Sequence, residues 1–93
     1  MLDSVSENWH RAAEFKARPA GVVLAEERVS LLTDRQKDVM RMLAEGMINK
    51  QIAHRLDISV ATVKTHIAAA VRRMKARNRI HAVAMLIRAE SFA

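Results

Sequence analysis

The sequence predicts an all-α protein in which a four-helix domain, residues 32–93, follows a short N-terminal extension, residues 1–31. Two observations lead to this prediction. Apolar residues recur at helical spacing in four successive segments, and residues that favour helix ends separate one segment from the next. The chain has 93 residues, enough for one small domain but too few to enclose a large cavity, so we do not expect a deep substrate pocket.

The first helix of the domain is predicted from about Asp34 to Glu45. Thr33 and Gln36 have the spacing of a capping box, in which each side chain bonds the backbone N–H of the other residue. Gly46 follows at the point where a residue in the left-handed conformation commonly ends a helix. The apolar positions at helical spacing are Val39, Met40 and Leu43.

A short second helix is predicted over Asn49–Leu56, with Asn49 as its N-terminal cap. Residues 57–59 are enough only for a tight turn, after which Ser59 caps a third helix over about Val60–Lys75. The apolar residues of this third helix fall on a single stripe that should be buried. They are Val63, Ile67, Ala70 and Met74.

The fourth helix is predicted from about Arg79 to Ala89, with Asn78 as its cap. Its apolar content exceeds what a small domain needs for its own core, so one face should pack inward and the other should lack a partner within the chain. We expect the inward face to be Ile80, Val83, Ala84 and Ile87, and the unpartnered face to be Ala82, Met85, Leu86 and Ala89.

The N-terminal extension is less clearly patterned. Residues 6–18, SENWHRAAEFKAR, suit a short amphipathic helix that Pro19 and Gly21 would stop. Beyond that point two alternatives stay open. Residues 22–24 suit an extended linker, and residues 24–29 suit another turn of helix.

The net charge of +6 is unevenly distributed. Residues 1–30 hold four basic and five acidic side chains, whereas residues 31–93 hold twelve and five. Residues 58–89 hold seven basic side chains and no acidic one. Such a local field suits a polyanion such as nucleic acid, although a solvated basic face is the alternative explanation.

The predicted order of a short helix, a three-residue turn and a longer amphipathic helix is the helix-turn-helix pattern. The side of the third helix opposite Val63 is nearly bare, because small residues occupy most of it. Small side chains let a helix lie in the major groove of DNA, about 12 Å wide, while longer donors reach phosphates on either side. The simpler alternative is that alanine is only a good helix former. The outward residues are Ala61, Thr65, Ala68 and Arg72, flanked by Lys64 and Ala69.

Four segments in order, LTDRQKDVMRMLAEG, NKQIAHRLDIS, TVKTHI and RNRIHAV, together resemble the C-terminal DNA-binding domain of LuxR-type regulators, which the NarL and FixJ response regulators share. The resemblance covers roughly Leu32 to Leu86. It implies that Gln36–Glu45 supports the fold, that Asn49–Leu56 is the scaffold helix, and that Val60–Lys75 is the recognition helix. With the charge pattern it predicts DNA contacts from Asn49, Lys50, Thr62, Lys64, Thr65, Ala68, Ala69, Arg72, Arg73 and Arg77.

The sequence departs from the family pattern at several positions. The family usually has Ser or Thr at Ile48, Glu at Gln51 and Gly at Lys75, and often a polar residue at Ala68 or Ala69. Two alanines offer only methyl contacts to bases, so specificity should rest more on Lys64, on Thr65 and on DNA shape.

The resemblance also implies dimerisation through the fourth helix on a two-fold, inverted-repeat operator. The dimer contacts are then expected from the unpartnered face: Ala82, Met85, Leu86 and Ala89. In the alternative, the N-terminal segment with Trp9 and Phe15 folds back and covers Met85 and Leu86.

Several function classes receive no support. The chain has no cysteine, and His10, His54, His66 and His81 lack ligand spacing, so we expect no metal site, no cofactor and no enzymatic activity. No apolar run of about 18 residues or secretory signal is present, and a cytoplasmic protein without membrane association is expected.

The expected partners are double-stranded DNA, a second copy of the chain and, less directly, RNA polymerase. Two other functions stay open. Region 4 of sigma factors has a similar helix-turn-helix, although the fourth helix argues against it. A basic protein-interaction module with residual DNA affinity is the second. The chain is either part of a longer regulator or a naturally short member of the family.

Overall fold

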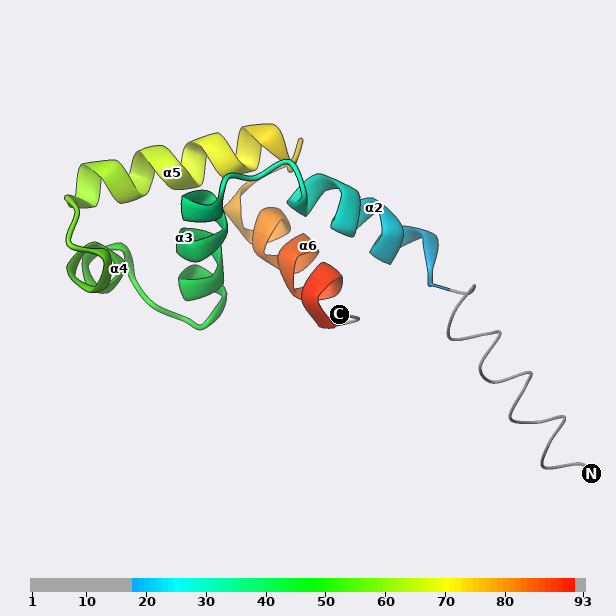
Figure 1. Ribbon diagram of the computed structural model, residues 1–93, viewed down its shortest axis with the longest axis horizontal. Coiled ribbons are helices and arrows are strands. Elements are labelled where there is room, and N and C mark those ends of the chain that lie inside the picture. The colour runs from blue at the N-terminus through cyan, green and yellow to red at the C-terminus, as the bar shows by residue number, and fades with distance from the viewer. Residues whose placement is uncertain (1–17, 92–93) are drawn as a thin grey trace, which may run out of the picture.

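The computed structural model describes residues 18–91, and within them the chain forms five helices and no strand (Figure 1). The predicted all-α fold is therefore confirmed. The predicted helix over residues 6–18 lies almost wholly outside the described residues. The helices are α2 Ala20–Val29, α3 Asp34–Ala44, α4 Asn49–Leu56, α5 Val60–Arg73 and α6 Arg79–Ser91.

Short-range signals set the ends of α3 as predicted. The Thr33 hydroxyl accepts from the Gln36 N–H at 3.1 Å, and the Gln36 amide oxygen accepts from the Thr33 N–H at 3.0 Å, which completes the capping box. At the other end Gly46 has a φ of 92°. The Met47 N–H then donates to the Met42 carbonyl at 3.2 Å, so carbonyls of the last turn find partners.

The N-terminus of α4 differs from the prediction. Asn49 is the first residue of the helix and not its cap, because Ile48 occupies the cap position. The Gln51 side chain still reaches back and accepts from the Ile48 N–H at 3.0 Å. An isoleucine side chain has no acceptor to return that bond, so only half of a capping box forms.

The N-terminal caps of α5 and α6 are the residues that the sequence predicted. The Ser59 hydroxyl accepts from the Thr62 N–H at 3.0 Å, and the Asn78 side chain accepts from the His81 N–H at 2.9 Å. The sequence did not reveal that His81 reciprocates, since its Nδ1 accepts from the Arg77 N–H at 3.0 Å. The tight turn between the two helices is therefore held from both sides.

α2 begins at the two residues that the sequence marked as helix breakers. Pro19 is its N-terminal cap and Gly21 lies in its first turn, while the helix that both were expected to stop lies almost wholly outside the described residues. Proline is tolerated at the start of α2 since the first residues of a helix need no N–H partner. The Pro19 carbonyl accepts from the Val22 N–H at 2.8 Å. The helix is stabilised by a buried face of Val22, Ala25 and Val29 that packs on α6.

The core is built around α5, whose predicted stripe is confirmed as buried. Val63, Ala70 and Met74 have no exposed surface, and Ile67 is 6% exposed. α3, α4 and α6 all pack against this helix. They contribute the buried side chains of Val39, Met40, Ile52, Ala53, Ala82, Met85 and Leu86 to the same cluster.

The predicted faces of α6 were wrong, because the helix is turned by about half a revolution. The residues expected outside, Ala82, Met85, Leu86 and Ala89, are all at most 5% exposed. Of those expected inside, Ile80 and Ile87 are 77% and 49% exposed, and Ala84 is exposed while Val83 is half-buried. Apolar residues line both sides of α6, so periodicity could not choose between them. The choice is made by α2, α3 and α5, which all pack on one side of α6.

The alternative in which the segment with Trp9 and Phe15 folds back stays a prediction, but another part of the N-terminal extension covers this side of α6. α2 lies beside α6 in Figure 1, and Arg28 of α2 contacts the sulfur of Met85 at 3.8 Å. The residues first expected to provide this cover, Trp9 and Phe15, lie outside the described residues.

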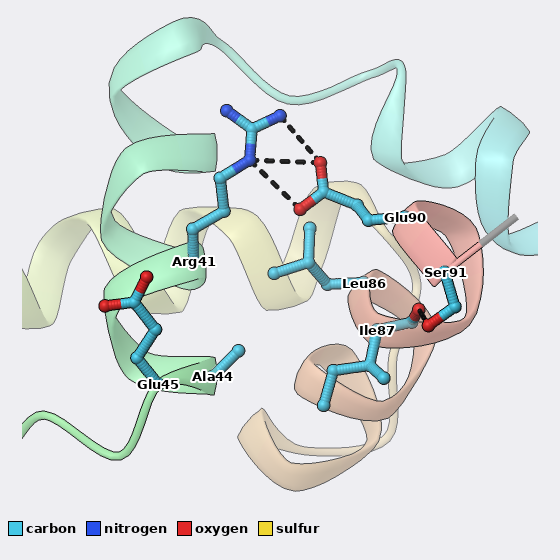
Figure 2. Close-up of a pocket in the computed structure, with 7 residues that line it drawn as sticks. All are labelled: Arg41, Ala44, Glu45, Leu86, Ile87, Glu90 and Ser91. Carbon is cyan, nitrogen blue, oxygen red and sulfur yellow. Dashed lines mark hydrogen bonds and ion pairs between the residues drawn. The ribbon is translucent and has the colours of Figure 1, made fainter. Parts of the chain in front are cut away.

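A bidentate ion pair joins α3 to the last turn of α6 at the rim of a shallow groove (Figure 2). Nε and Nη2 of Arg41 donate to the Glu90 carboxylate oxygens at 2.7–3.0 Å. These hydrogen bonds hold the pKa of Glu90 below its ordinary value. The two side chains are 48% and 38% exposed, so water and salt screen the pair.

Substitutions at Lys75 and Gly46 should show how much stability the left-handed backbone conformation costs when a Cβ is present. Lys75 has a φ of 53° after the end of α5, and Lys75→Gly should stabilise the fold by about 0.5–1 kcal/mol because glycine adopts this conformation without a Cβ clash. Gly46→Ala is the reverse substitution, because it adds a Cβ at a residue with a positive φ. No atom lies within 4 Å of the added Cβ, so its expected loss of about 1 kcal/mol is conformational. Thermal unfolding of both variants measures the shifts, and a destabilised Lys75→Gly would contradict the prediction.

Removal of the Glu90 charge should lower stability slightly and only where the carboxylate is ionised. Glu90→Gln is expected to lose about 0.5 kcal/mol or less at neutral pH, the scale of an exposed pair. Since the pKa of Glu90 is depressed in the folded state, its stabilisation is present above the unfolded carboxyl pKa, about 4.3, and disappears as pH falls through the folded pKa.

Urea titrations of wild type and Glu90→Gln at a series of pH values would show the two curves converging in acid. Glu45→Gln is the control, because Glu45 lines the same groove but makes no ion pair within residues 18–91. A difference between wild type and Glu90→Gln that stays constant below about pH 4 would point to a source other than the charge.

Candidate nucleic-acid interface

α5 lies along one edge of the molecule, with α3, α4 and α6 on its inner side (Figure 1). The face opposite the buried stripe is open to solvent, as predicted. Ala69, expected beside this face, is half-buried. The exposed residues are Ala61, Lys64, Thr65, Ala68 and Arg72.

The turn before α5 sets its direction relative to α4. Asp57 adopts the left-handed conformation with a φ of 54°, and the Ile58 N–H donates back to the Ala53 carbonyl at 3.0 Å. The chain therefore passes from α4 to α5 within the predicted three residues. α4 packs against α5, which places Asn49 and Lys50 at the start of the supporting helix, half-buried and exposed respectively.

The hydroxyl groups of α5 are engaged within the helix. The Thr62 and Ser59 hydroxyls lie 2.8 Å apart and bond each other. The Thr65 hydroxyl donates to the Ala61 carbonyl at 3.0 Å. Thr62 is half-buried and Thr65 is exposed, so of these hydroxyls the outward face presents that of Thr65.

The cations around this face pair with no carboxylate in the described part of the chain. Within residues 18–91 the ion pairs are Arg18 with Glu26 and Arg41 with Glu90, neither of which involves α5. The positive charges at the end of α5 and in the turn that follows are therefore left to solvent or to a polyanion. They belong to Arg72, Arg73, Lys75 and Arg77, and Lys64 in the first half of α5 is likewise exposed.

Two arginines have contacts that the sequence did not indicate. Arg73 donates from Nη1 to the Leu31 carbonyl at 3.2 Å, which ties the end of α5 to the segment between α2 and α3. Arg79 donates to the Asn49 side-chain oxygen at 3.4 Å. No local pattern could have revealed either contact, because 42 and 30 residues separate the partners.

The pattern of a known family matches this arrangement. The family model described as bacterial regulatory proteins, luxR family, matches residues 30–86. The chain belongs to the LuxR family. This assignment confirms the resemblance and sets aside the sigma-factor alternative. The match includes the predicted scaffold and recognition helices, α4 and α5, and begins within the end of the N-terminal extension.

Relatives with this LuxR-family domain are bacterial regulators. The nitrate/nitrite response regulator NarL of Escherichia coli K12 is 39% identical over 71 residues, 76% of this chain and 32% of NarL. NarP of the same organism is 44% identical over 62 residues, 67% of this chain and 29% of NarP. The C4-dicarboxylate transport regulator DctR of Rhodobacter capsulatus is 40% identical over 77 residues, 83% of this chain and 37% of DctR.

The chain thus spans about a third of the length of the relatives it matches. No solved structure matches it. Among residues 18–91, no helix is long and apolar enough to cross a membrane. Nor does this described part of the chain bring together three histidine, aspartate or glutamate side chains that could hold a metal ion.

Proposed function

We propose that this LuxR-family domain binds operator DNA as a dimer and regulates transcription, with α5 in the major groove. The observation that supports this most is the exposed face of α5, where small side chains lie between cations that pair with no carboxylate within residues 18–91. A helix with this surface can approach base edges closely while its long side chains reach phosphates.

The proposed roles follow from the position of each side chain. Lys64 and Thr65 contact base edges from the first half of α5, with Ala68 and Ala69 as methyl contacts. Arg72 and Arg77 contact phosphates, as do Asn49, Lys50 and Thr62 from the starts of α4 and α5. Arg73 can share its guanidinium between a phosphate and the Leu31 carbonyl, because arginine has five N–H donors.

We also propose that the domain is the output part of a longer regulator. NarL and NarP are response regulators by name, and this chain matches about a third of each. A preceding sensory segment would supply the input, and the protein would act in the cytoplasm, where its DNA lies. Contact with RNA polymerase stays a prediction.

Affinity for duplex DNA should depend steeply on salt. Log affinity is expected to fall against log salt by about 0.9 for each phosphate that a side chain neutralises. Arg72→Ala and Arg77→Ala should each weaken binding to duplex and flatten this slope by roughly one. Fluorescence anisotropy of a labelled duplex across a salt series measures both effects.

Arg88→Ala is the matched control for this series. Arg88 belongs to the same acid-free stretch of sequence, but it lies on α6, where its guanidinium approaches Gly21 of α2. Its removal should leave the slope unchanged. Equal effects of Arg88→Ala and Arg72→Ala would mean that net charge, and not the face of α5, determines binding.

The dimer contact is proposed on the face of α6 that the fold leaves exposed. The residues first expected there are in the core, so they are not available to a second molecule. Ile80 and Ile87, at 77% and 49% exposed, have the large apolar surface that an interface needs. A two-fold pair would place its two α5 helices about 34 Å apart, one turn of DNA.

A double substitution on this face should separate dimerisation from folding. Ile80→Glu with Ile87→Glu should keep the helical circular dichroism of wild type and change the stoichiometry on an inverted-repeat duplex from two chains to one. Sedimentation equilibrium with the duplex measures this. Leu86→Glu is the contrast, because it places a charge at a fully packed position and should unfold the domain. A two-to-one complex of the double variant would refute the interface.

A further inference from the structure

The middle of α5 has a defined hydrogen-bonding polarity. A threonine hydroxyl has one hydrogen, and the Thr65 hydroxyl donates it to the Ala61 carbonyl one turn earlier, at 3.0 Å. The lone pairs of the Thr65 oxygen remain. Because Thr65 is exposed, the group that it offers outward is an acceptor.

The surroundings of Thr65 strengthen this polarity. Ala61 and Ala68, one turn before and almost one turn after it, are exposed and carry only methyl groups. The hydroxyls of Ser59 and Thr62 are paired with each other. The other side chains with donor groups near Thr65 are Lys64, which is exposed on the flank, His66, which is half-buried, and Arg72, which lies about 10 Å farther along the axis at 1.5 Å per residue. The strip therefore consists of one acceptor between methyl groups.

The acceptor selects among base pairs. In the major groove only adenine N6 and cytosine N4 carry donor hydrogens, while guanine offers two acceptors and thymine offers one acceptor and a methyl group. A threonine oxygen placed against guanine would meet a second acceptor and leave both groups unsatisfied. The neighbouring methyl groups distinguish adenine from cytosine, because only adenine is paired with thymine, whose C5-methyl group can contact an alanine.

Resting on the proposed function that α5 lies in the major groove, we infer that Thr65 reads adenine, accepting a hydrogen bond from its N6 amino group. Ala61 or Ala68 contacts the methyl group of the paired thymine. Each half-site then contains one A·T pair opposite the middle of the helix, and Thr65 is a specificity-determining residue whose acceptor carries the selection.

Binding-site selection with three proteins tests the inference. Wild type should select adenine at one position of each half-site. Thr65→Val has nearly the same shape and keeps a methyl group but has no acceptor, so its preference for adenine at that position should fall by about tenfold to a hundredfold. Thr65→Ser keeps the hydroxyl and should retain the preference. Thr65 is on the exposed face, so the fold should tolerate both changes, which circular dichroism checks.

Modified duplexes test the two contacts separately. Purine in place of the selected adenine removes only the amino group, and it should weaken wild type about tenfold or more while leaving Thr65→Val nearly unchanged. Uracil in place of the paired thymine removes only the methyl group and should weaken both proteins. Equal sensitivity of wild type and Thr65→Val to the missing amino group would overturn the inference.

Failure of the inference can be told apart from failure of the proposed function. If wild type and Thr65→Val both bind duplex with the expected salt slope but select the same base, or if wild type selects guanine there, only the reading by Thr65 is refuted. If wild type does not bind duplex DNA, the proposed function fails and the inference fails with it.

Discussion

Burial of one stripe of α5 is the constraint on which the rest of the structure depends. Val63, Ile67, Ala70 and Met74 place apolar surface against three other helices, and moving this surface into water would cost several kcal/mol at about 25 cal/mol per Å². A helix is rigid, so fixing its buried side also fixes its opposite side. The exposed face with Thr65 is thus oriented by side chains that lie in the core.

The second constraint is that α2, α3 and α5 pack on the same side of α6. This helix is apolar on both sides, and the domain buries the side with slender or flexible residues, Ala82, Met85, Leu86 and Ala89. α2 and α3 close over that side. One consequence is that α2 belongs to the folded unit although it precedes the four predicted helices. Another is that Ile80 and Ile87 stay outside, where a second molecule can reach them.

Most of the charged residues that stabilise the fold differ from those proposed to bind DNA. The Arg41–Glu90 pair joins α3 to α6 away from α5, whereas the cations at the end of α5 and after it have no carboxylate partner in the described part of the chain. Mutual repulsion among these cations lowers the stability of the free domain and is relieved when a polyanion binds. Arg73 belongs to both groups, since it holds the Leu31 carbonyl beside the proposed interface.

The sequence by itself determined the features whose partners lie within a few residues of one another. The capping box of Thr33 and Gln36, the caps Ser59 and Asn78, and the turn at residues 57–59 all depend on bonds across three to five residues. The burial of α5 followed from an unambiguous apolar stripe, and with it most of the outward face could be predicted. The polarity of Thr65 could not, because either a donor or an acceptor fits the same sequence.

Tertiary structure decided the features for which the local sequence pattern allows more than one arrangement. An apolar residue occupies each side of α6, so its inward face was settled only by the helices packed against it. Arg28 with Met85, Arg41 with Glu90 and Arg73 with Leu31 join residues 57, 49 and 42 positions apart. α2 likewise includes Gly21 because packing on α6 outweighs the weak helix propensity of glycine. Such contacts depend on how whole helices meet in space, which no short window of sequence contains.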